Sequence, residues 1–281
     1  MTTALVTDST AYLSPELVEA HGIGVVPLHV VVGGQERREG VDVGPGEVAE
    51  ALRTFKPVST SRPAPQAFLD VYRDLAEKGA DAIVSVHISA DMSSTIGSAQ
   101  LAANSSPVPV TVVDSRSMGM AMGYAVLAGA ELASHGGSAE DVAALVRARC
   151  DGATVVFYVD TLEHLRRGGR IGKANALLGS ALAIKPILGL RDGSIVPLER
   201  VRTSSRAIAR LEDLAVEAAA SAGSVDVAVH HLDSLERADK LAERLRSRID
   251  GLEELVVVEL GAVVGAHVGP GTLAIAISPR A

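Results

Sequence analysis

DAIVSVHISADMSSTIGSAQLA, residues 81–102, is the stretch that decides the fold. Apolar residues dominate 82–88, which predicts a short buried strand, and 96–102 predicts a helix. The polar loop between them ends in three hydroxyls, Ser93, Ser94 and Thr95. A helix N-terminus carries unpaired backbone N–H groups and partial positive charge. These hydroxyls therefore form either an ordinary helix cap or a binding site for a carboxylate or phosphate.

The segments on either side of this stretch repeat its order of strand and helix. Strands are predicted at 4–6 and 107–113, and helices at 65–78, 120–134 and 139–148. Such alternation predicts a mostly parallel sheet covered by helices on both faces. We expect a three-layer α/β/α domain over residues 1–152, interrupted by an irregular β excursion at about 23–45.

The pattern changes beyond Gly152. The pair Asp192-Gly193 is a hairpin turn signal between predicted strands at 185–190 and 195–201. Further along, helices and strands follow one another in a mixed order. A chain of 281 residues also exceeds the usual size of a single core. We therefore expect residues 153–281 to form an α+β domain with a mixed sheet.

Composition excludes several classes of protein. Hydrophobic residues make up 47% of the chain but aromatic residues only 2%, so the interior is aliphatic. The net charge of −8 and the few aromatic rings argue against a nucleic-acid-binding protein. The single cysteine and the lack of a long apolar run favour a cytoplasmic protein without stable membrane insertion, which is compatible with transient membrane contact.

Several well-known motifs are incomplete in this sequence. The first strand-to-helix loop, 7–10, has no glycine, which disfavours a dinucleotide site. The P-loop-like segment 168–173 has Arg167 where a glycine is needed and Ala174 where a hydroxyl is needed. The sequence also lacks G-x-S-x-G and H-E-x-x-H. We expect neither a metal nor a cofactor.

Candidate ligand groups lie in two loops of the first half. Asp8 and Ser9 follow the first strand at its carboxyl end, where open α/β sheets bind ligands, although turn chemistry explains them equally well. The segment 58–63, VSTSRP, is a second loop rich in hydroxyls that precedes a helix. It repeats the arrangement of the loop that carries Ser93 and therefore contributes a second set of candidate donors.

Three groups in the second half are candidates for binding an anion. Arg170 lies in a glycine-rich bend, Arg202 ends a predicted hairpin strand, and His267 lies in the segment AHVGPG. Each has an ordinary interpretation as well, because an isolated arginine is usually solvated and an isolated histidine is usually a core or surface residue. The motifs in which these three residues lie favour an anion-binding role over the ordinary one.

Seven motifs occur in the order of one family, namely TDST at Thr7, TSRP at Thr60, SST at Ser93, LRRGGRI at Leu165, IKP at Ile184, VR at Val201 and AHVGPG at Ala266. Through them nearly the whole chain resembles the DegV family, the fatty-acid-binding subunit of bacterial fatty acid kinase. The resemblance implies that Thr60, Ser93 and His267 bind the carboxylate of a long-chain fatty acid. It further implies a set of groups around the head group or its phosphate, Arg170, Arg202, Ser61, Ser94, Asp8 and Ser9.

The resemblance also implies a partner. In the family, a separate ATP-binding kinase subunit phosphorylates the bound carboxylate, and the acyl-phosphate passes to phospholipid synthesis. This chain would then be a lipid-binding subunit with no catalytic residue of its own. The alternatives are a stand-alone acyl-phosphate or ester hydrolase that uses Ser93 and His267, and a binding module for another anionic lipid or small phosphate. The sequence departs from the family at Arg62, Ser94 and Val268, where Gln, Gly and Thr are common.

Overall fold

The computed structural model describes residues 2–177 and 184–280. It divides into two compact units, each assembled from two separate stretches of the chain. Unit 1 comprises Met1–His29 and Ser61–Gly152, and unit 2 comprises Val30–Thr60 and Ala153–Ala281. The division into independently folding domains at residue 152 stays a prediction.

Unit 1 is built on a parallel sheet with the strand order β2-β1-β6-β7. The strands are β1 (Thr3–Asp8), β2 (Gly24–Val26), β6 (Ala82–His87) and β7 (Val110–Asp114). The helices are η1 (Ser9–Ala11), α1 (Pro15–Ala20), α3 (Pro65–Glu77), α4 (Thr95–Ala103), α5 (Met120–Ser134) and α6 (Ala139–Gly152). The predicted parallel sheet is confirmed.

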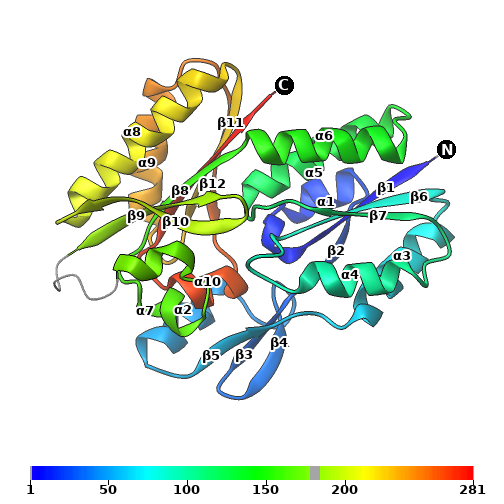
Figure 1. The fold of residues 1–281 in the computed structure, drawn as a ribbon, viewed down its shortest axis with the longest axis horizontal. Helices are drawn as coiled ribbons and strands as arrows, with labels where there is room; N and C mark the ends of the chain where they lie inside the picture. Colours follow the sequence, from blue (N-terminus) through cyan, green and yellow to red (C-terminus); the bar gives the residue numbers. More distant parts are fainter. Residues whose placement is uncertain (1, 178–183, 281) are drawn as a thin grey trace. The chain divides into compact units, whose positions relative to one another are not determined.

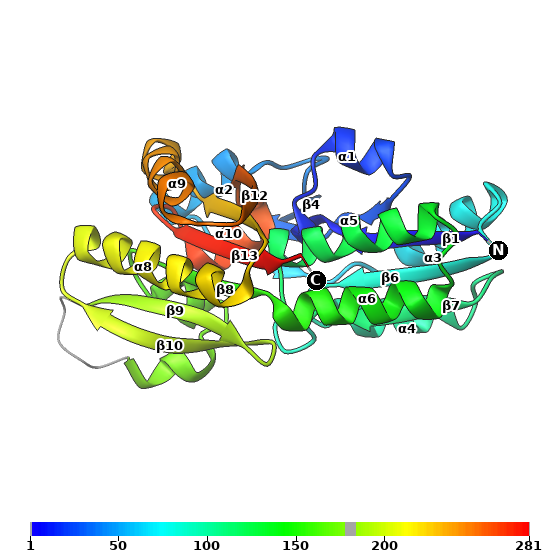
Figure 2. The ribbon, with the colours of Figure 1, turned by 90° about the horizontal axis from the view of Figure 1, so that it is seen from above.

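Helices cover both faces of this sheet, and alternate strand residues explain why. Leu5 and Val84 point to the face on which α5 and α6 pack, whereas Val6 and Ile83 point to the face on which α3 and α4 pack. Figure 1 shows one pair of helices on each side of the strands, and Figure 2 shows α5 and α6 running side by side. The three-layer α/β/α arrangement is confirmed.

Unit 2 contains a six-stranded sheet with the order β10-β9-β8-β13-β11-β12. The strands are β8 (Thr154–Tyr158), β9 (Lys185–Arg191), β10 (Ser194–Val201), β11 (Val225–His231), β12 (Leu252–Glu259) and β13 (Leu273–Pro279). The pair β11 and β12 is parallel and the other neighbouring pairs are antiparallel, so the predicted mixed sheet is confirmed. The hairpin turn at Asp192 and Gly193 has positive φ angles of 52° and 80°, as its sequence predicts.

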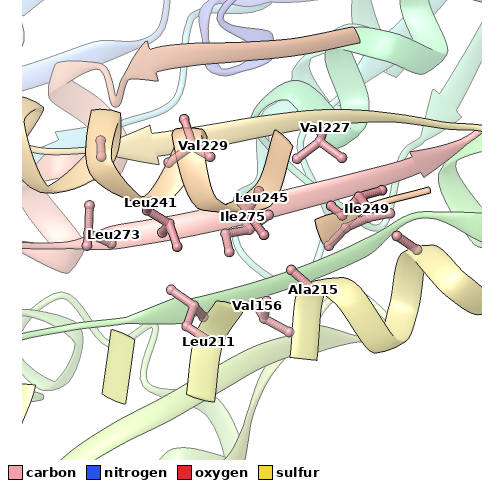
Figure 3. Packing of buried hydrophobic residues seen from close by; sticks show 14 of the residues in the cluster. Val156, Leu211, Ala215, Val227, Val229, Leu241, Leu245, Ile249, Leu273 and Ile275 are labelled. Carbon is pink, nitrogen blue, oxygen red and sulfur yellow. The ribbon is translucent and has the colours of Figure 1, made fainter. Parts of the chain in front are cut away.

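Helices α8 (Ser204–Ala222) and α9 (Leu235–Arg248) pack on this sheet and enclose the main core of unit 2. Figure 3 shows that core, to which the helices contribute Leu211, Ala215, Leu241 and Leu245. The strand residues that face them are aliphatic as well. The aromatic-poor composition therefore gives a core made largely of Val, Leu, Ile and Ala.

Among its described residues, the remainder of unit 2 contains a small sheet with the order β4-β3-β5 and three short α-helices. The strands are β3 (His29–Val32), β4 (Gln35–Arg38) and β5 (Val58–Ser61), and the helices are α2 (Pro45–Arg53), α7 (Glu163–Arg167) and α10 (Ala262–Val268), with η2 at Gly172–Leu177.

Two sequence-based expectations about this region were wrong. The predicted β excursion begins too early, because β2 pairs with β1 in the sheet of unit 1. The segment predicted as a hydroxyl-rich loop is in fact strand β5, because its backbone pairs in the small sheet although its side chains are polar. Among the helices of residues 2–177 and 184–280, none has the length and hydropathy that spanning a bilayer requires.

Candidate functional site

The loop between β6 and α4 presents the hydroxyls that the sequence singled out. Ser93 is half-buried, and its Oγ lies 2.8 Å from Thr95 Oγ1 and accepts a weak hydrogen bond from the Thr95 backbone N–H at 3.3 Å. Ser94 is exposed and is the N-cap residue of α4, but its side chain makes no capping bond within the described part of the chain. If Thr95 donates its hydroxyl hydrogen to Ser93, the Ser93 hydrogen is available to a carboxylate.

Asp8 and Ser9 hold the end of β1 in place. Asp8 is fully buried, and its carboxylate accepts hydrogen bonds from the backbone N–H groups of Thr10 and Ile88, both at 3.0 Å. Ser9 Oγ accepts a hydrogen bond from the Leu28 backbone N–H at 3.0 Å. Asp8 therefore lies inside unit 1 with its carboxylate occupied by protein groups.

In unit 2, the structure brings Thr60 and His267 together. Thr60 lies on β5 and His267 near the end of α10, and Thr60 Oγ1 is 2.8 Å from His267 Nε2. The other ring nitrogen, Nδ1, is buried and has no hydrogen-bond partner in the described residues. Ser61, the last residue of β5, is half-buried beside Thr60 in the chain.

The protonation of His267 determines what Thr60 can offer a ligand. Burial and, to a smaller extent, the positive charge of Arg170 together lower the pKa of His267 to about 4, so the ring is neutral at pH 7. A proton on Nδ1 would be a buried donor without a partner, which is costly. The proton therefore lies on Nε2 and is donated to Thr60 Oγ1. Thr60 then keeps its own hydroxyl hydrogen for an acceptor such as a carboxylate.

Glycines make room for the polar side chains around His267. A methyl group at Gly168 would lie 2.0 Å from His267 Nδ1, and one at Gly269 would lie 2.2 Å from Cδ2 of His164. His267 of α10 packs against Gly168, which follows α7, and His164 of α7 packs against Gly269, which follows α10. The two histidine rings thus interlock. This contact explains the first glycine of the LRRGGRI motif, Gly168, and the first glycine of the AHVGPG motif, Gly269, by the space that each leaves.

The start of α10 depends on a buried carboxylate. Glu39, which follows β4, is buried, and its Oε1 accepts a hydrogen bond from the Val263 backbone N–H at 2.8 Å. Val263 lies in the first turn of α10, where backbone N–H groups lack partners within the helix. Glu39 therefore helps to position the helix that carries His267.

The cations of the LRRGGRI segment have different environments. Arg166 and Arg167 both donate hydrogen bonds to Glu163, at 2.7 Å each. These bonds lower the pKa of Glu163 to about 2, and the bond from Arg166 has the larger effect. Arg170 is half-buried and donates a hydrogen bond from Nη1 to the Gly168 carbonyl at 2.7 Å. Ion pairing with Glu163 therefore reduces the net charge of the patch that Arg166 and Arg167 would otherwise form.

The remaining predicted residues lie near the ends of elements. Arg202 is exposed and directly follows β10. Of the residues that depart from the family pattern, Arg62 is exposed and Val268 is buried at the end of α10. Within residues 2–177 and 184–280, no three His, Cys, Asp or Glu side chains are arranged as metal ligands.

Sequence reasoning missed Glu39 and the polar residues Ser85 and His87 of β6. Glu39 belongs to a charged run that has no distinguishing pattern. Ser85 and His87 did carry a signal, because they alternate with apolar residues in a strand that is otherwise hydrophobic.

Comparison with known proteins gives consistent matches along the chain. The family model described as an uncharacterised protein of the DegV family matches residues 2–280. A DegV domain-containing protein of Streptomyces coelicolor is 52% identical over 277 residues, which are 99% of this chain and 98% of that relative. Among solved structures, a DegV family protein from Thermus thermophilus, described by its fatty acid binding, is 35% identical with a TM-score of 0.94. DegV of Bacillus subtilis, described as a fatty acid binding protein, is 35% identical with a TM-score of 0.91. Both structural matches cover 100% of each chain.

Proposed function

Because the chain belongs to the DegV family, we propose that it binds one long-chain fatty acid and presents the carboxylate to a separate, ATP-binding kinase subunit. The observation that carries the binding part is the match, along the whole chain, to solved DegV proteins described as binding fatty acids. The kinase part rests on the family motifs. Formation of an acyl-phosphate for phospholipid synthesis in the cytoplasm belongs to the same proposal.

We assign the fatty acid carboxylate to a site of Thr60, Ser93 and His267, in which Thr60 and Ser93 are the direct donors and His267 acts through Thr60. The hydrogen-bond pattern supports this assignment, because His267 can donate to Thr60 and thereby leaves the Thr60 hydroxyl free to donate. A hydrogen bond to a charged group is worth about 1.5–3 kcal/mol, so a few such donors suffice to orient the head group. The acyl chain supplies most of the affinity, at about 0.8 kcal/mol for each buried methylene.

The remaining head-group residues are proposed by their place in the family motifs. We assign Arg170 and Arg202 to the phosphate that develops during transfer, because forked, permanently charged donors suit a phosphoryl group. Ser61 and Ser94 are the chain neighbours of Thr60 and Ser93. Their hydroxyls are further candidate donors to the head group.

The first experiment identifies the ligand. Protein purified without added lipid should yield a fatty acid in a ratio near one to one when it is denatured, extracted and analysed by mass spectrometry. Removal of this ligand should lower the melting temperature, because a ligand that binds only the folded state stabilises it. Repeated extraction without any fatty acid would contradict the assignment.

The second experiment tests the head-group residues. Thr60→Val keeps the side-chain shape but removes the hydroxyl, and we expect it to weaken fatty acid binding by about 10- to 100-fold. Ser59→Ala is the matched control, because Ser59 is an exposed neighbour on the same strand. Unchanged binding by the Thr60 variant would remove Thr60 from the site.

The third experiment tests transfer. With ATP and the kinase subunit, the loaded protein should form an acyl-phosphate that hydroxylamine traps as a hydroxamate. The same protein alone should release no product from a chromogenic ester. The hydrolase alternative requires that His267 activate Ser93. The hydrogen bonds of these side chains instead join His267 Nε2 to Thr60 and Ser93 Oγ to Thr95.

A further inference from the structure

A chain of polar side chains runs through the buried interior of unit 1. Tyr72 OH lies 2.8 Å from Ser85 Oγ, which lies 2.7 Å from His87 Nε2, and His87 Nδ1 lies 3.1 Å from Asp8 Oδ2. All four residues are fully buried. We call Tyr72, Ser85 and His87 the buried polar chain, and Asp8 is the group at which it ends. Buried polar groups are costly unless they are paired, and each of these is paired.

The hydrogen bonds of the buried polar chain run in one direction. A carboxylate only accepts hydrogen bonds, so His87 Nδ1 donates to Asp8. If Nδ1 carries the only hydrogen of the ring nitrogens, Nε2 accepts from the Ser85 hydroxyl, which in turn accepts from Tyr72. Burial raises the pKa of Tyr72 to about 12, so the phenol keeps the hydrogen that this direction requires. The whole chain therefore holds the His87 ring with its N–H directed at Asp8.

The same order of groups occurs in serine hydrolases, but here it does not form a nucleophile. Ser85 is fully buried, and its oxygen already accepts a hydrogen bond from Tyr72. The ring of Phe68 also packs edge-on against His87, with centroids 5.1 Å apart. A substrate carbonyl has no access to Ser85, so the chain acts on structure and not on a reacting atom.

Asp8 connects the buried polar chain to the loop that carries Ser93. Its Oδ2 accepts the bond from His87 and also the bond from the Ile88 backbone N–H at 3.0 Å. Ile88 is the first residue after β6, so this bond sets the direction in which the loop leaves the strand.

The loop between Ile88 and Ser93 is short and closed by its own backbone. The Ser89 carbonyl accepts hydrogen bonds from the N–H groups of Met92 and Ser93, both at 3.0 Å, and the Ser89 N–H donates to the Ser117 carbonyl at 2.9 Å. A shift of the backbone at Ile88 is therefore passed to Ser93 with little slack between them. A short run of hydrogen-bonded backbone therefore joins Ile88, which Asp8 holds, to Ser93.

We propose that Asp8 is a positioning residue for the head-group hydroxyl of Ser93, held in its orientation by the buried polar chain. This role rests on the proposed function, because only a bound fatty acid supplies the carboxylate to which Ser93 would donate. Asp8 acts through the protein backbone and not through contact with the ligand. The carboxylate is tolerated where it is fully buried, since two backbone N–H groups and His87 all donate to it.

The test compares two ligands with the same tail, palmitic acid and hexadecan-1-ol. General damage to the fold lowers the affinity for both ligands. A misplaced Ser93 lowers the affinity for the acid selectively, because hydrogen bonds to a charged acceptor are stronger than those to a neutral one. In Asp8→Asn the new amide N–H group faces donors. We expect the affinity for palmitic acid to fall about tenfold and that for the alcohol to change less than about twofold.

Three further variants complete the experiment. Asp81→Asn is the control, because Asp81 accepts a hydrogen bond from the Thr2 backbone N–H at 2.7 Å at the other end of β6, and it should keep the wild-type ratio of affinities. Ser85→Ala breaks the buried polar chain without touching Asp8 and should lower the ratio about threefold. Tyr72→Phe removes the donor at the far end of the buried polar chain and should lower the ratio less than Ser85→Ala does, because Ser85 still donates to His87.

The measured ratios of acid to alcohol affinity either support or overturn the positioning role of Asp8. A folded Asp8→Asn or Ser85→Ala protein with the wild-type ratio of acid to alcohol affinity overturns the positioning role. If Asp8→Asn does not fold, as circular dichroism would show, the Ser85 variant decides alone. A wild-type protein that binds acid and alcohol equally would refute the carboxylate site itself, and this failure is visible before any variant is made.

Discussion

Replacement of Gly168 by alanine should destabilise unit 2, because the added methyl group has no room beside His267. Gly168 has φ −73° and ψ −11°, a helical conformation open to any residue, so the backbone itself does not require glycine. The methyl group would lie 2.0 Å from Nδ1 and 2.8 Å from Cε1 of the His267 ring. The ring must move and give up its bond to Thr60. Overpacking and the lost bond together should lower the free energy of unfolding by roughly 2–4 kcal/mol.

A double-mutant cycle shows whether the ring is the cause. The four proteins are the wild type, Gly168→Ala, His267→Ala and the double variant, with stability measured by urea unfolding. Without the ring, alanine at position 168 should be neutral or stabilise by up to about 1 kcal/mol, because it restricts the unfolded chain. Gly46→Ala in α2 is a matched control, since a methyl group there meets no atom within 4 Å. The interlock is refuted if alanine at position 168 costs the same with and without His267.

Three further predictions concern the same region. The pKa values of His267 and His230 are lowered to about 4, so both rings must be protonated at a cost as the pH falls below about 6.5. We expect each histidine to lower the free energy of unfolding by up to about 3 kcal/mol as the pH approaches 4. A melting temperature that stays constant from pH 7 to 5 would contradict this. Glu39→Ala should cost about 1–3 kcal/mol and speed hydrogen exchange at the first turn of α10, whereas protection equal to the wild type would show that the carboxylate is dispensable. Arg170→Ala or Arg202→Ala should change fatty acid affinity less than about threefold but reduce acyl-phosphate formation at least about tenfold, and a pull-down with the kinase subunit separates lost docking from lost chemistry.

Long elements with a clear hydrophobic period were predictable from the sequence. Helix α3 spans Pro65–Glu77, against the expected 65–78, because Phe68, Tyr72 and Leu75 recur with helical spacing and a proline begins it. The hairpin at Asp192 and Gly193 was equally clear, since this residue pair favours the positive φ angles that a tight turn needs. The order of these elements was enough to predict the layers of unit 1 and the mixed sheet of unit 2.

Short elements that depend on distant partners were not predictable. The strand β5 consists of polar residues apart from Val58, and only its pairing in the small sheet makes it a strand. The helix α10 is seven residues long and contains Gly265, so local preference for a helix is weak there. Its first turn is completed by Glu39, a partner 224 residues away in the sequence. A single sequence carries no record of such a contact.

The candidate site shows the same division. The hydroxyls of Thr60 and Ser93 stood out because they precede helices, and the family motifs added His267. The sequence did not predict the burial of Asp8. The hydrogen bonds that make this burial possible come from Thr10 and from residues about 80 positions further along the chain. Its position after a strand indicated a ligand contact, whereas its hydrogen bonds indicate a support for the neighbouring loop.

The bond between Glu39 and α10 has a consequence for synthesis on the ribosome. A ribosome adds about 5–20 residues per second, so the Val263 N–H emerges roughly 10–45 s after Glu39. During that interval the carboxylate of Glu39 lacks the Val263 N–H group from which it later accepts a hydrogen bond. A nascent chain that stalls before residue 262 therefore leaves Thr60 without His267, however well the earlier residues have folded.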